Sequence, residues 1–153
     1  MSTADSEQKA NVEMRDVIVR GTADGFSQQI VAGPHRLQAD EPRRAGGTDT
    51  GPSPYDFLLA ALGSCTSMTV AMYARRKGWP LESVTVRLRH FKIHATDCAE
   101  CETRIGMLDR IDRHVHFEGA LTTDQIRRLQ EIADKCPLHR TLTSEIDIRT
   151  NIV

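Results

Sequence analysis

A long apolar segment in the middle of the chain constrains the fold more than any other feature. The stretch from Phe57 to Ala74 is apolar almost all round a helical projection, and three cationic residues, Arg75, Arg76 and Lys77, follow it. A helix with no polar face has to be covered on several sides. Four hydroxyl side chains interrupt the segment, so no continuous apolar run approaches the roughly 18 residues needed to span a bilayer. We therefore expect a central, buried helix of a soluble protein.

Both ends of this helix are marked in the sequence. Ser53 suits the N-cap, Pro54 suits the first helical position, and Asp56 stands three residues past the cap. At the other end, the cationic residues favour the negative end of the helix dipole, and Gly78 suits the position after the last helical residue. These signals predict a helix of about 24 residues.

Composition narrows the class of protein. The chain has 153 residues, 39% of them hydrophobic, and a net charge of −1, so no global field draws it to nucleic acid or anionic lipid. Residues 1–14 are polar, lack a secretory h-region, and are predicted to be a disordered tail before a single domain over residues 15–153. Four cysteines without a signal peptide favour a reducing compartment, and we expect the cytoplasm.

Alternating patterns predict strands on either side of the long helix. A second helix follows, with Thr122 and Gln125 as a possible capping box. A polar, glycine-rich stretch, Asp40–Pro52, is expected to be a mobile loop. The expected strands are Asp16–Thr22, Phe26–Ala32, His35–Ala39, Ser83–His94 with a bulge near Arg89 or His90, Ile111–Gly119 and Ile146–Ile152. This order predicts an α+β fold with mainly antiparallel pairing.

Two cysteines lie on the apolar faces of the predicted helices. Cys65 is in the middle of the long helix, where a thiol is inert unless a cation or a dipole activates it. Cys136 precedes Pro137, so the second helix should end there and a new helical turn can begin with Cys136 at its N-cap. Each cysteine alone fits a structural role, as core filler or helix breaker. The pair together indicates a buried dithiol that can cycle.

The sequence around these cysteines resembles the OsmC/Ohr family of thiol-dependent hydroperoxide reductases. The resemblance rests on Pro54-Tyr55-Asp56 leading through LLAALGS into Cys65, and on Cys136-Pro137 near the C-terminus. It covers the chain from about Asp16 onward, including the order of elements. It implies an OsmC-like fold, with mainly antiparallel sheets around a long central helix, in an intertwined homodimer with sites at the interface.

The resemblance also implies a reaction. Cys65 would be the peroxidatic cysteine, Cys136 the resolving cysteine, and an external dithiol the reductant of the disulfide that they form. The substrate would be an organic hydroperoxide, and no metal or bound organic cofactor is required. We therefore expect a cysteine-based peroxidase of oxidative-stress defence. The alternative is a non-enzymatic dimer that binds an apolar small molecule in the same cleft.

The chain departs from the family at two positions. The family activates its thiolate with an arginine in the N-terminal hairpin, where this chain has Ala23; the candidates to replace it are Arg20, Arg36, Arg43 and Arg44. The family's acidic partner falls where this chain has Tyr55, and Asp56 is the next residue. We retain Asp56 as a candidate catalytic residue beside its capping role. Tyr55 could bind a peroxide, but packing is its expected role.

A second pair of cysteines lies in a polar connection. Cys98-Ala99-Glu100-Cys101 is a C-x-x-C motif, and His94 could add a third metal ligand. A structural zinc site needs four ligands, and the fourth is not evident. Three interpretations therefore remain open: a metal-responsive site, a second redox pair, and a hairpin tip without chemical function.

Overall fold

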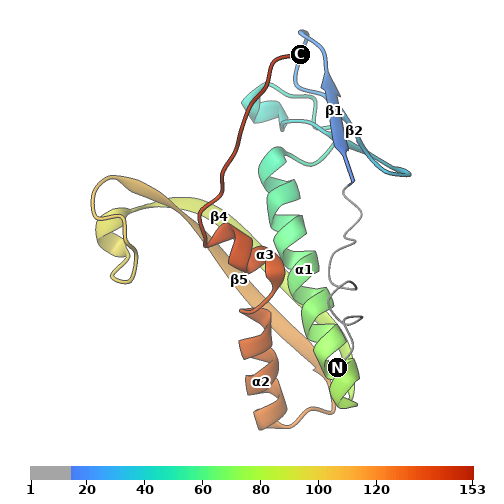
Figure 1. The fold of residues 1–153 in the computed structure, drawn as a ribbon, viewed down its shortest axis with the longest axis vertical. Helices are drawn as coiled ribbons and strands as arrows, with labels where there is room; N and C mark the ends of the chain where they lie inside the picture. Colours follow the sequence, from blue (N-terminus) through green and yellow to red (C-terminus); the bar gives the residue numbers. More distant parts are fainter. Residues whose placement is uncertain (1–14) are drawn as a thin grey trace, which may run out of the picture. The chain divides into compact units, whose positions relative to one another are not determined.

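The computed structural model describes residues 15–153 (Figure 1). Their contacts divide the chain into two compact units, one ending at Pro54 and the other beginning at Tyr55. The tail predicted for residues 1–14 lies outside the described residues. The elements are those of an α+β protein with antiparallel sheets and one long helix, so the predicted fold class is confirmed.

The first unit contains a three-stranded antiparallel sheet. Its strands are β1 (Val17–Gly21), β2 (Gln28–Ala32) and β3 (His35–Ala39), which pair in the order β1-β2-β3. The turns use Gly25 and Gly33 with φ of 79° and 59°, a backbone region that residues with a Cβ rarely adopt. All three predicted strands are confirmed; β1 and β2 are slightly shorter than predicted, and β3 has the predicted bounds.

The glycine-rich segment after β3 is organised around one carboxylate, although the sequence predicted a mobile loop. The buried Asp40 side chain accepts hydrogen bonds from the backbone and hydroxyl groups of Thr48 and Thr50 and from the backbone N–H of Glu41. A short 3-10 helix, η1 (Arg43–Ala45), lies within the segment. The polar residues that suggested a mobile loop are the hydrogen-bond donors that hold this segment in place.

The long helix α1 (Pro54–Lys77) lies in the second unit apart from its first residue, and its predicted bounds are confirmed. Gly78 ends it with φ of 66° and donates to the carbonyl of Arg75 at 3.1 Å, while Trp79 donates to that of Ala74 at 2.9 Å. These two bonds form a Schellman motif. By length and composition α1 would also pass as a membrane span, a test that core helices of soluble proteins pass as well.

A long hairpin packs beside α1. Strand β4 (Leu81–His94) pairs antiparallel with β5 (Met107–Gly119), and the 3-10 helix η2 (Ala95–Asp97) lies in their connection. The bulge predicted near Arg89 or His90 is wrong, because the register is continuous there. His90 keeps its alternation and stacks on Tyr55, with ring centroids 4.4 Å apart, while Phe91 faces outward and is 39% exposed. The one shift in register lies between Leu81 and Ser83.

Two further helices complete the unit. Helix α2 (Thr123–Ala133) starts with the predicted capping box of Thr122 and Gln125, and α3 (Pro137–Leu142) follows Cys136 directly. The core forms where α1 meets α2. Its buried residues are Val70, Ala74, Leu129, Ile132 and Ala133.

The predicted closing strand is wrong, because residues 145–153 have no regular structure. Ile148 and Ile152 are 83% and 93% exposed. A strand requires a hydrogen-bonding neighbour, and the alternating pattern alone supplies none.

Parts of α1 remain uncovered, contrary to the expectation of a helix buried on several sides. Met68 and Met72 are 70% and 50% exposed. A single copy of the chain therefore leaves apolar side chains of its central helix in contact with solvent.

Candidate functional site

The candidate site forms where α3 begins. Cys136 has extended backbone angles, as expected for a residue before proline, and its side chain caps the helix. The backbone N–H of His139 donates to the Cys136 sulfur at 3.3 Å. Cys136 is completely buried. The predicted N-cap position of this cysteine is confirmed.

Helix α1 supplies the second wall of the site. Cys65 is half-buried and lies close enough to Cys136 to help lower the pKa of the Cys136 thiol. The next residue, Thr66, is fully buried, with its hydroxyl 3.7 Å from the Cys136 sulfur and 2.7 Å from the carbonyl oxygen of Leu62. The two thiols, 71 positions apart in sequence, are both free and lie together within one chain.

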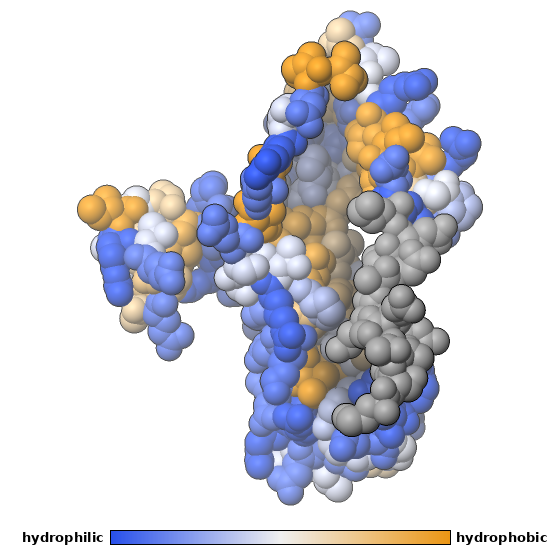
Figure 2. All heavy atoms as spheres, viewed as in Figure 1, coloured by the Kyte–Doolittle hydropathy of each residue, from blue (hydrophilic) through white to orange (hydrophobic). Residues whose placement is uncertain are grey.

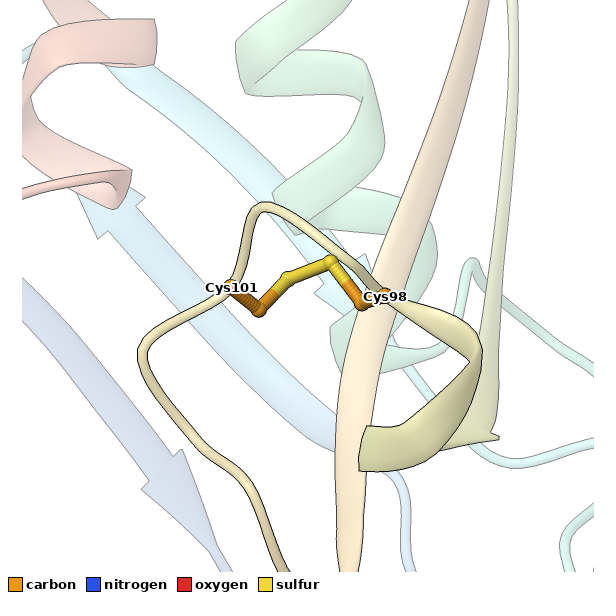
Figure 3. Close-up of a disulfide and its surroundings, with 2 residues drawn as sticks. All are labelled: Cys98 and Cys101. Atoms are coloured by element: carbon orange, nitrogen blue, oxygen red, sulfur yellow. A yellow bond between two sulfur atoms is a disulfide. The ribbon is translucent and has the colours of Figure 1, made fainter.

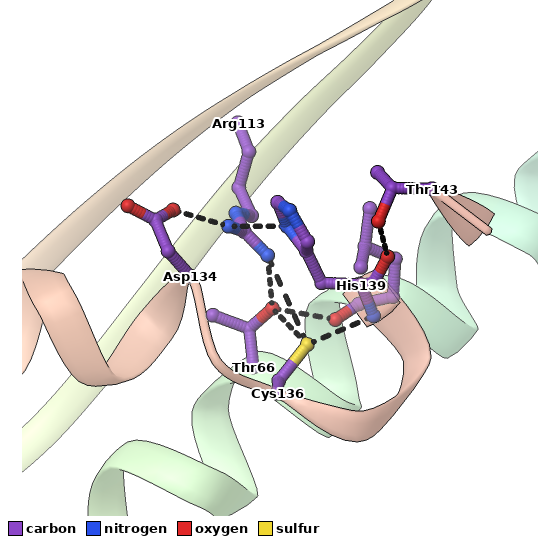
Figure 4. A network of polar contacts seen from close by, with 7 residues as sticks. Thr66, Arg113, Asp134, Cys136, His139 and Thr143 are labelled. Atoms are coloured by element: carbon purple, nitrogen blue, oxygen red, sulfur yellow. Dashed lines mark hydrogen bonds and ion pairs between the residues drawn. The ribbon is translucent and has the colours of Figure 1, made fainter. Parts of the chain in front are cut away.

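Strand β5 contributes a cation, Arg113 (Figure 4). Its guanidinium donates to the Thr66 hydroxyl at 2.9 Å and to the Cys136 sulfur at 3.9 Å. The second terminal nitrogen donates to the Asp134 carboxylate at 2.9 Å and to Nδ1 of His139 at 3.1 Å. Since arginine only donates, Nδ1 of His139 is the unprotonated ring nitrogen. The Arg113 side chain is only 10% exposed, and both of its terminal nitrogens have hydrogen-bond partners.

These contacts change the pKa of the Cys136 thiol. Burial alone raises the pKa of its thiol. Hydrogen bonds from the His139 N–H, the Thr66 hydroxyl and Cys65, together with the positive charge of Arg113, outweigh burial and hold that pKa below its ordinary value. Cys136 is therefore set up to carry a thiolate beside the Cys65 thiol.

A pocket of about 420 Å³ opens next to this cluster. Arg113, Asp134 and His139 line its polar side. Its apolar side consists of Leu62, Ile111 and Leu142. The size is in the range of ligand pockets. Neither Cys65 nor Cys136 lines this pocket, which lies beside the cluster and shares Arg113, Asp134 and His139 with it.

The other predicted site residues do not join the two cysteines. Asp56 is exposed in the first turn of α1, nine residues before Cys65, which corresponds to about 13 Å along the axis and half a turn around it. Its catalytic role stays a prediction. Tyr55 packs on His90, as expected. The candidate replacements for the missing arginine, which are Arg20, Arg36, Arg43 and Arg44, belong to the first compact unit, so their proposed role also stays a prediction.

Sequence reasoning missed Arg113 as a site residue. The signal was present, because Arg113 interrupts the apolar side of the predicted strand, between Ile111 and Val115. A charged residue on the core side of a strand needs a buried partner. Its partners, Thr66, Asp134 and Cys136, come from elements whose arrangement only the fold reveals.

The second cysteine pair is bonded. Cys98 and Cys101 form a disulfide in the connection after η2, with a Cα–Cα distance of 5.4 Å (Figure 3). Among residues 15–153 no group of three or more His, Cys, Asp or Glu side chains could hold a metal ion. The interpretation of His94 as a third ligand therefore finds no support in the geometry.

The profile of the family described as OsmC-like protein matches residues 47–151. None of the curated proteins compared with the chain matches it.

Several solved structures share the fold at low sequence identity. An OsmC-like protein from Mycoplasma pneumoniae is 19% identical, with a TM-score of 0.65 over 86% of this chain and 88% of its own. An organic hydroperoxide resistance protein OsmC from Legionella pneumophila is 19% identical, with a TM-score of 0.65 over 90% and 95%. The organic hydroperoxide resistance protein OhrB of Bacillus subtilis is 17% identical, with a TM-score of 0.59 over 88% and 93%.

Proposed function

The chain belongs to the OsmC-like protein family, and from this premise we propose that it is a cysteine-based peroxidase that reduces organic hydroperoxides. The observation that carries the proposal is that the free Cys65 thiol lies close enough to Cys136 to help lower the pKa of the Cys136 thiol. A nucleophile and a second thiol in contact are what a peroxide-driven disulfide cycle requires. Similar proteins of Legionella pneumophila and Bacillus subtilis are described as organic hydroperoxide resistance proteins.

The first step uses the Cys136 thiolate as a base. It takes the proton of the Cys65 thiol, and the resulting Cys65 thiolate attacks the terminal oxygen of the hydroperoxide. The O–O bond breaks, the alkoxide leaves and receives the proton from Cys136, and the products are an alcohol and Cys65 sulfenic acid. In this scheme the cation Arg113, 3.9 Å from the Cys136 sulfur, takes the place of the missing hairpin arginine.

The second step forms the disulfide. The Cys136 thiolate, restored in the first step, attacks the sulfur of the Cys65 sulfenic acid, and hydroxide leaves and is protonated to water. An external dithiol then reduces the disulfide by exchange and becomes a disulfide itself, which returns two electrons and two protons to Cys65 and Cys136. Such reductants are plentiful in the cytoplasm, where we place the reaction.

The pocket supports an organic rather than an inorganic peroxide. Its apolar side, formed by Leu62, Ile111 and Leu142, can hold an alkyl or aryl group, while Arg113 faces the polar end. Hydrogen peroxide has no group that would bury this surface.

We also infer a homodimer. Met68 and Met72 expose apolar surface on α1, a helix that is apolar on nearly all sides. Burial of such surface favours association, and the family resemblance implies an intertwined pair. Analytical ultracentrifugation should give twice the chain mass, and Met68→Lys should shift the distribution toward the monomer. A monomeric wild-type protein would contradict the inference.

The experiment that tests the function measures both products. The reduced protein is treated with cumene hydroperoxide, and the cumyl alcohol formed is compared with the thiols lost. We expect one alcohol for each pair of thiols, regeneration by dihydrolipoamide, and no turnover by Cys65→Ser. Persistence of both thiols with no alcohol would favour the alternative, a non-enzymatic dimer that binds an apolar small molecule.

A further inference from the structure

The hydroxyl of Thr66 has one proton and two neighbours that can accept it. Its oxygen lies 2.7 Å from the carbonyl oxygen of Leu62 and 3.7 Å from the sulfur of Cys136. We propose that Thr66 is a positioning residue, whose hydroxyl proton turns from the Leu62 carbonyl to the Cys136 sulfur when that sulfur becomes a thiolate, and turns back when the charge is lost. The proposal deepens the proposed function and rests on it for the catalytic role of Cys136.

Burial restricts the partners of this hydroxyl to protein atoms. Figure 2 shows mainly hydrophilic residues on the outside of α2, but the site lies beneath that surface, where Thr66 and Cys136 are both completely buried. A buried polar group needs a hydrogen-bond partner, and a buried charge needs one even more. Each change of charge on the Cys136 sulfur therefore has to be matched by a group that already lies beside it.

The arrangement in the structure fits a neutral Cys136 thiol. The carbonyl of Leu62 can only accept, so it takes the Thr66 proton. The guanidinium of Arg113 can only donate, and at 2.9 Å it occupies one lone pair of the Thr66 oxygen (Figure 4). The other lone pair is left for Cys136. In this contact the sulfur is then the donor and carries its own proton.

A Cys136 thiolate reverses the requirement. With the Thr66 proton still on the carbonyl, a lone pair of the hydroxyl oxygen would face the negative sulfur. A small rotation about the Cα–Cβ bond of Thr66 moves the oxygen away from the carbonyl and directs the proton at the sulfur, while Arg113 keeps its acceptor. The Leu62 carbonyl is not left without a partner, because in α1 it also accepts the backbone N–H of Thr66.

The other groups around the sulfur do not make this change. The side chains with charge or a titratable proton at this site are Cys65 of α1, Arg113 of β5, Asp134 at the end of α2 and His139 of α3. Arg113 and the backbone N–H of His139 donate to the sulfur whatever its charge. Asp134 and the His139 ring bond to Arg113 instead, and Cys65 loses its own proton in the proposed reaction. Thr66 can accept from the thiol and donate to the thiolate.

The rotation follows the proposed reaction step by step. Thr66 donates to Cys136 while this sulfur is the base, and accepts from it once it has taken the Cys65 proton. It donates again to the thiolate that attacks the Cys65 sulfenic acid. In the disulfide the sulfur has neither proton nor charge, so the hydroxyl returns to Leu62. No covalent bond of Thr66 forms or breaks in any step.

The test uses a background in which Cys136 is the only thiol, Cys65→Ser/Cys98→Ser/Cys101→Ser. Thr66→Ser keeps the hydroxyl, Thr66→Val keeps the shape without it, and Thr66→Ala repeats the loss with a smaller side chain. Ultraviolet absorbance against pH and the rate of alkylation by iodoacetamide measure the thiolate. Thr69→Val is the matched control, because Thr69 donates to the carbonyl of residue 65 at 2.7 Å in the same way and, among residues 15–153, has no hydrogen bond to a sulfur.

We expect the loss of the hydroxyl to slow alkylation at neutral pH about tenfold in Thr66→Val and Thr66→Ala, because a pKa higher by one unit leaves a tenth of the thiolate. Thr66→Ser and Thr69→Val should react like the background protein. A hydroxyl that always donated to Leu62 would only present a lone pair to the sulfur. Its removal would then leave alkylation unchanged or make it faster, and either result would overturn the proposal.

A second comparison separates the hydroxyl from the cation, because Thr66→Val also removes an acceptor of Arg113. The Thr66→Val change is repeated together with Arg113→Gln in the same background. Slowing by Thr66→Val that persists in Arg113→Gln supports direct donation to the sulfur. Slowing that disappears there would show that Thr66 acts only by holding Arg113, which would overturn the proposal.

The catalytic consequence is measured in the chain with all its cysteines. Thr66→Val should form the Cys65–Cys136 disulfide with cumene hydroperoxide about tenfold more slowly than wild type at neutral pH, and approach the wild-type rate as the pH rises above the ordinary pKa of a thiol, about 8.5. Slowing by the same factor at every pH would contradict the assigned role. If the alkylation results are as expected but wild type forms no disulfide, the proposed function fails and the proton switch of Thr66 is supported.

Discussion

The guanidinium of Arg113 lies 3.9 Å from the sulfur of Cys136, although the two residues come from a strand and from the cap of a separate helix. The same side chain is fixed by Asp134 at 2.9 Å and by Thr66 at 2.9 Å, so its position does not depend on the cysteine. A cation held in this way stabilises a thiolate without having to be ordered during the reaction.

Replacement of Arg113 should weaken this stabilisation. In Arg113→Gln the pKa of Cys136 should rise, and the reduced protein should react with cumene hydroperoxide roughly tenfold more slowly at neutral pH, because one pKa unit corresponds to a tenfold change in thiolate. Ultraviolet absorbance of the thiolate against pH measures the first effect, and stopped-flow kinetics the second. Arg87→Gln, on the exposed side of β4, is the matched control. Equal slowing in both variants would contradict the role of Arg113.

The lowered pKa of Cys136 makes a prediction for stability as well as for rate. A thiol whose pKa is lower in the folded protein than in the unfolded chain stabilises the fold fully above the unfolded pKa, about 8.5, and loses this contribution as pH falls through the folded pKa. The free energy of unfolding of wild type minus that of Cys136→Ala should therefore increase with pH. Urea titrations across this range measure the difference. A difference that is flat or falls with pH would show that the thiolate is not stabilised.

The two cysteines should fail in different ways when replaced. In Cys136→Ser the Cys65 sulfenic acid has no resolving partner, so excess peroxide should convert it to sulfinic acid. Peptide mass spectrometry measures the added oxygen on Cys65, and wild type treated alike should show the disulfide instead. Because this variant also lacks the base that deprotonates Cys65, the reaction is run at a pH above the ordinary pKa of a thiol, about 8.5. If Cys65 stays free of oxygen even there, the assignment of the peroxidatic and resolving roles is wrong.

Asp40 should be essential to the segment after β3. Hydrogen bonds from Thr48, together with those from Thr50 and Glu41, outweigh burial and hold the pKa of Asp40 well below its ordinary value. Its ionised form therefore stabilises the fold above about pH 4, and this contribution is lost as the pH falls further.

In Asp40→Asn an amide group would face these donors, so we expect a Tm several degrees lower near neutral pH and a smaller difference in acid. Thermal unfolding followed by circular dichroism at several pH values measures both effects. Asp49→Asn is the control, because asparagine tolerates the φ of 57° found there. A Tm unchanged by Asp40→Asn would contradict the role given to this carboxylate.

Local sequence signals predicted the elements of the fold well. The limits of α1 follow from Pro54 and Gly78, and the start of α2 follows from the capping box of Thr122 and Gln125. Where the outcome depends on a distant partner, local patterns failed. The alternation after Ile146 did not produce a strand, and the change of phase near His90 was resolved by stacking on Tyr55 rather than by a bulge.

The candidate site, like the fold, was only partly predictable from the sequence. Cys136 was predictable as an N-cap because the proline that follows it restricts the backbone of Cys136 itself. The contact of Arg113 with Cys136 joins residues 23 positions apart, and no periodic pattern encodes it. An arginine on the core side of a strand was the only sign in the sequence that a buried acceptor lay opposite.

The measurement that tests the central claim most directly is peptide mapping of the reduced wild-type protein after one equivalent of cumene hydroperoxide, with free thiols trapped by maleimide. The account predicts a disulfide-linked peptide pair containing Cys65 and Cys136, which dihydrolipoamide returns to two thiols. Cys65 and Cys136 both recovered as free thiols, with the peroxide unconsumed, would contradict it.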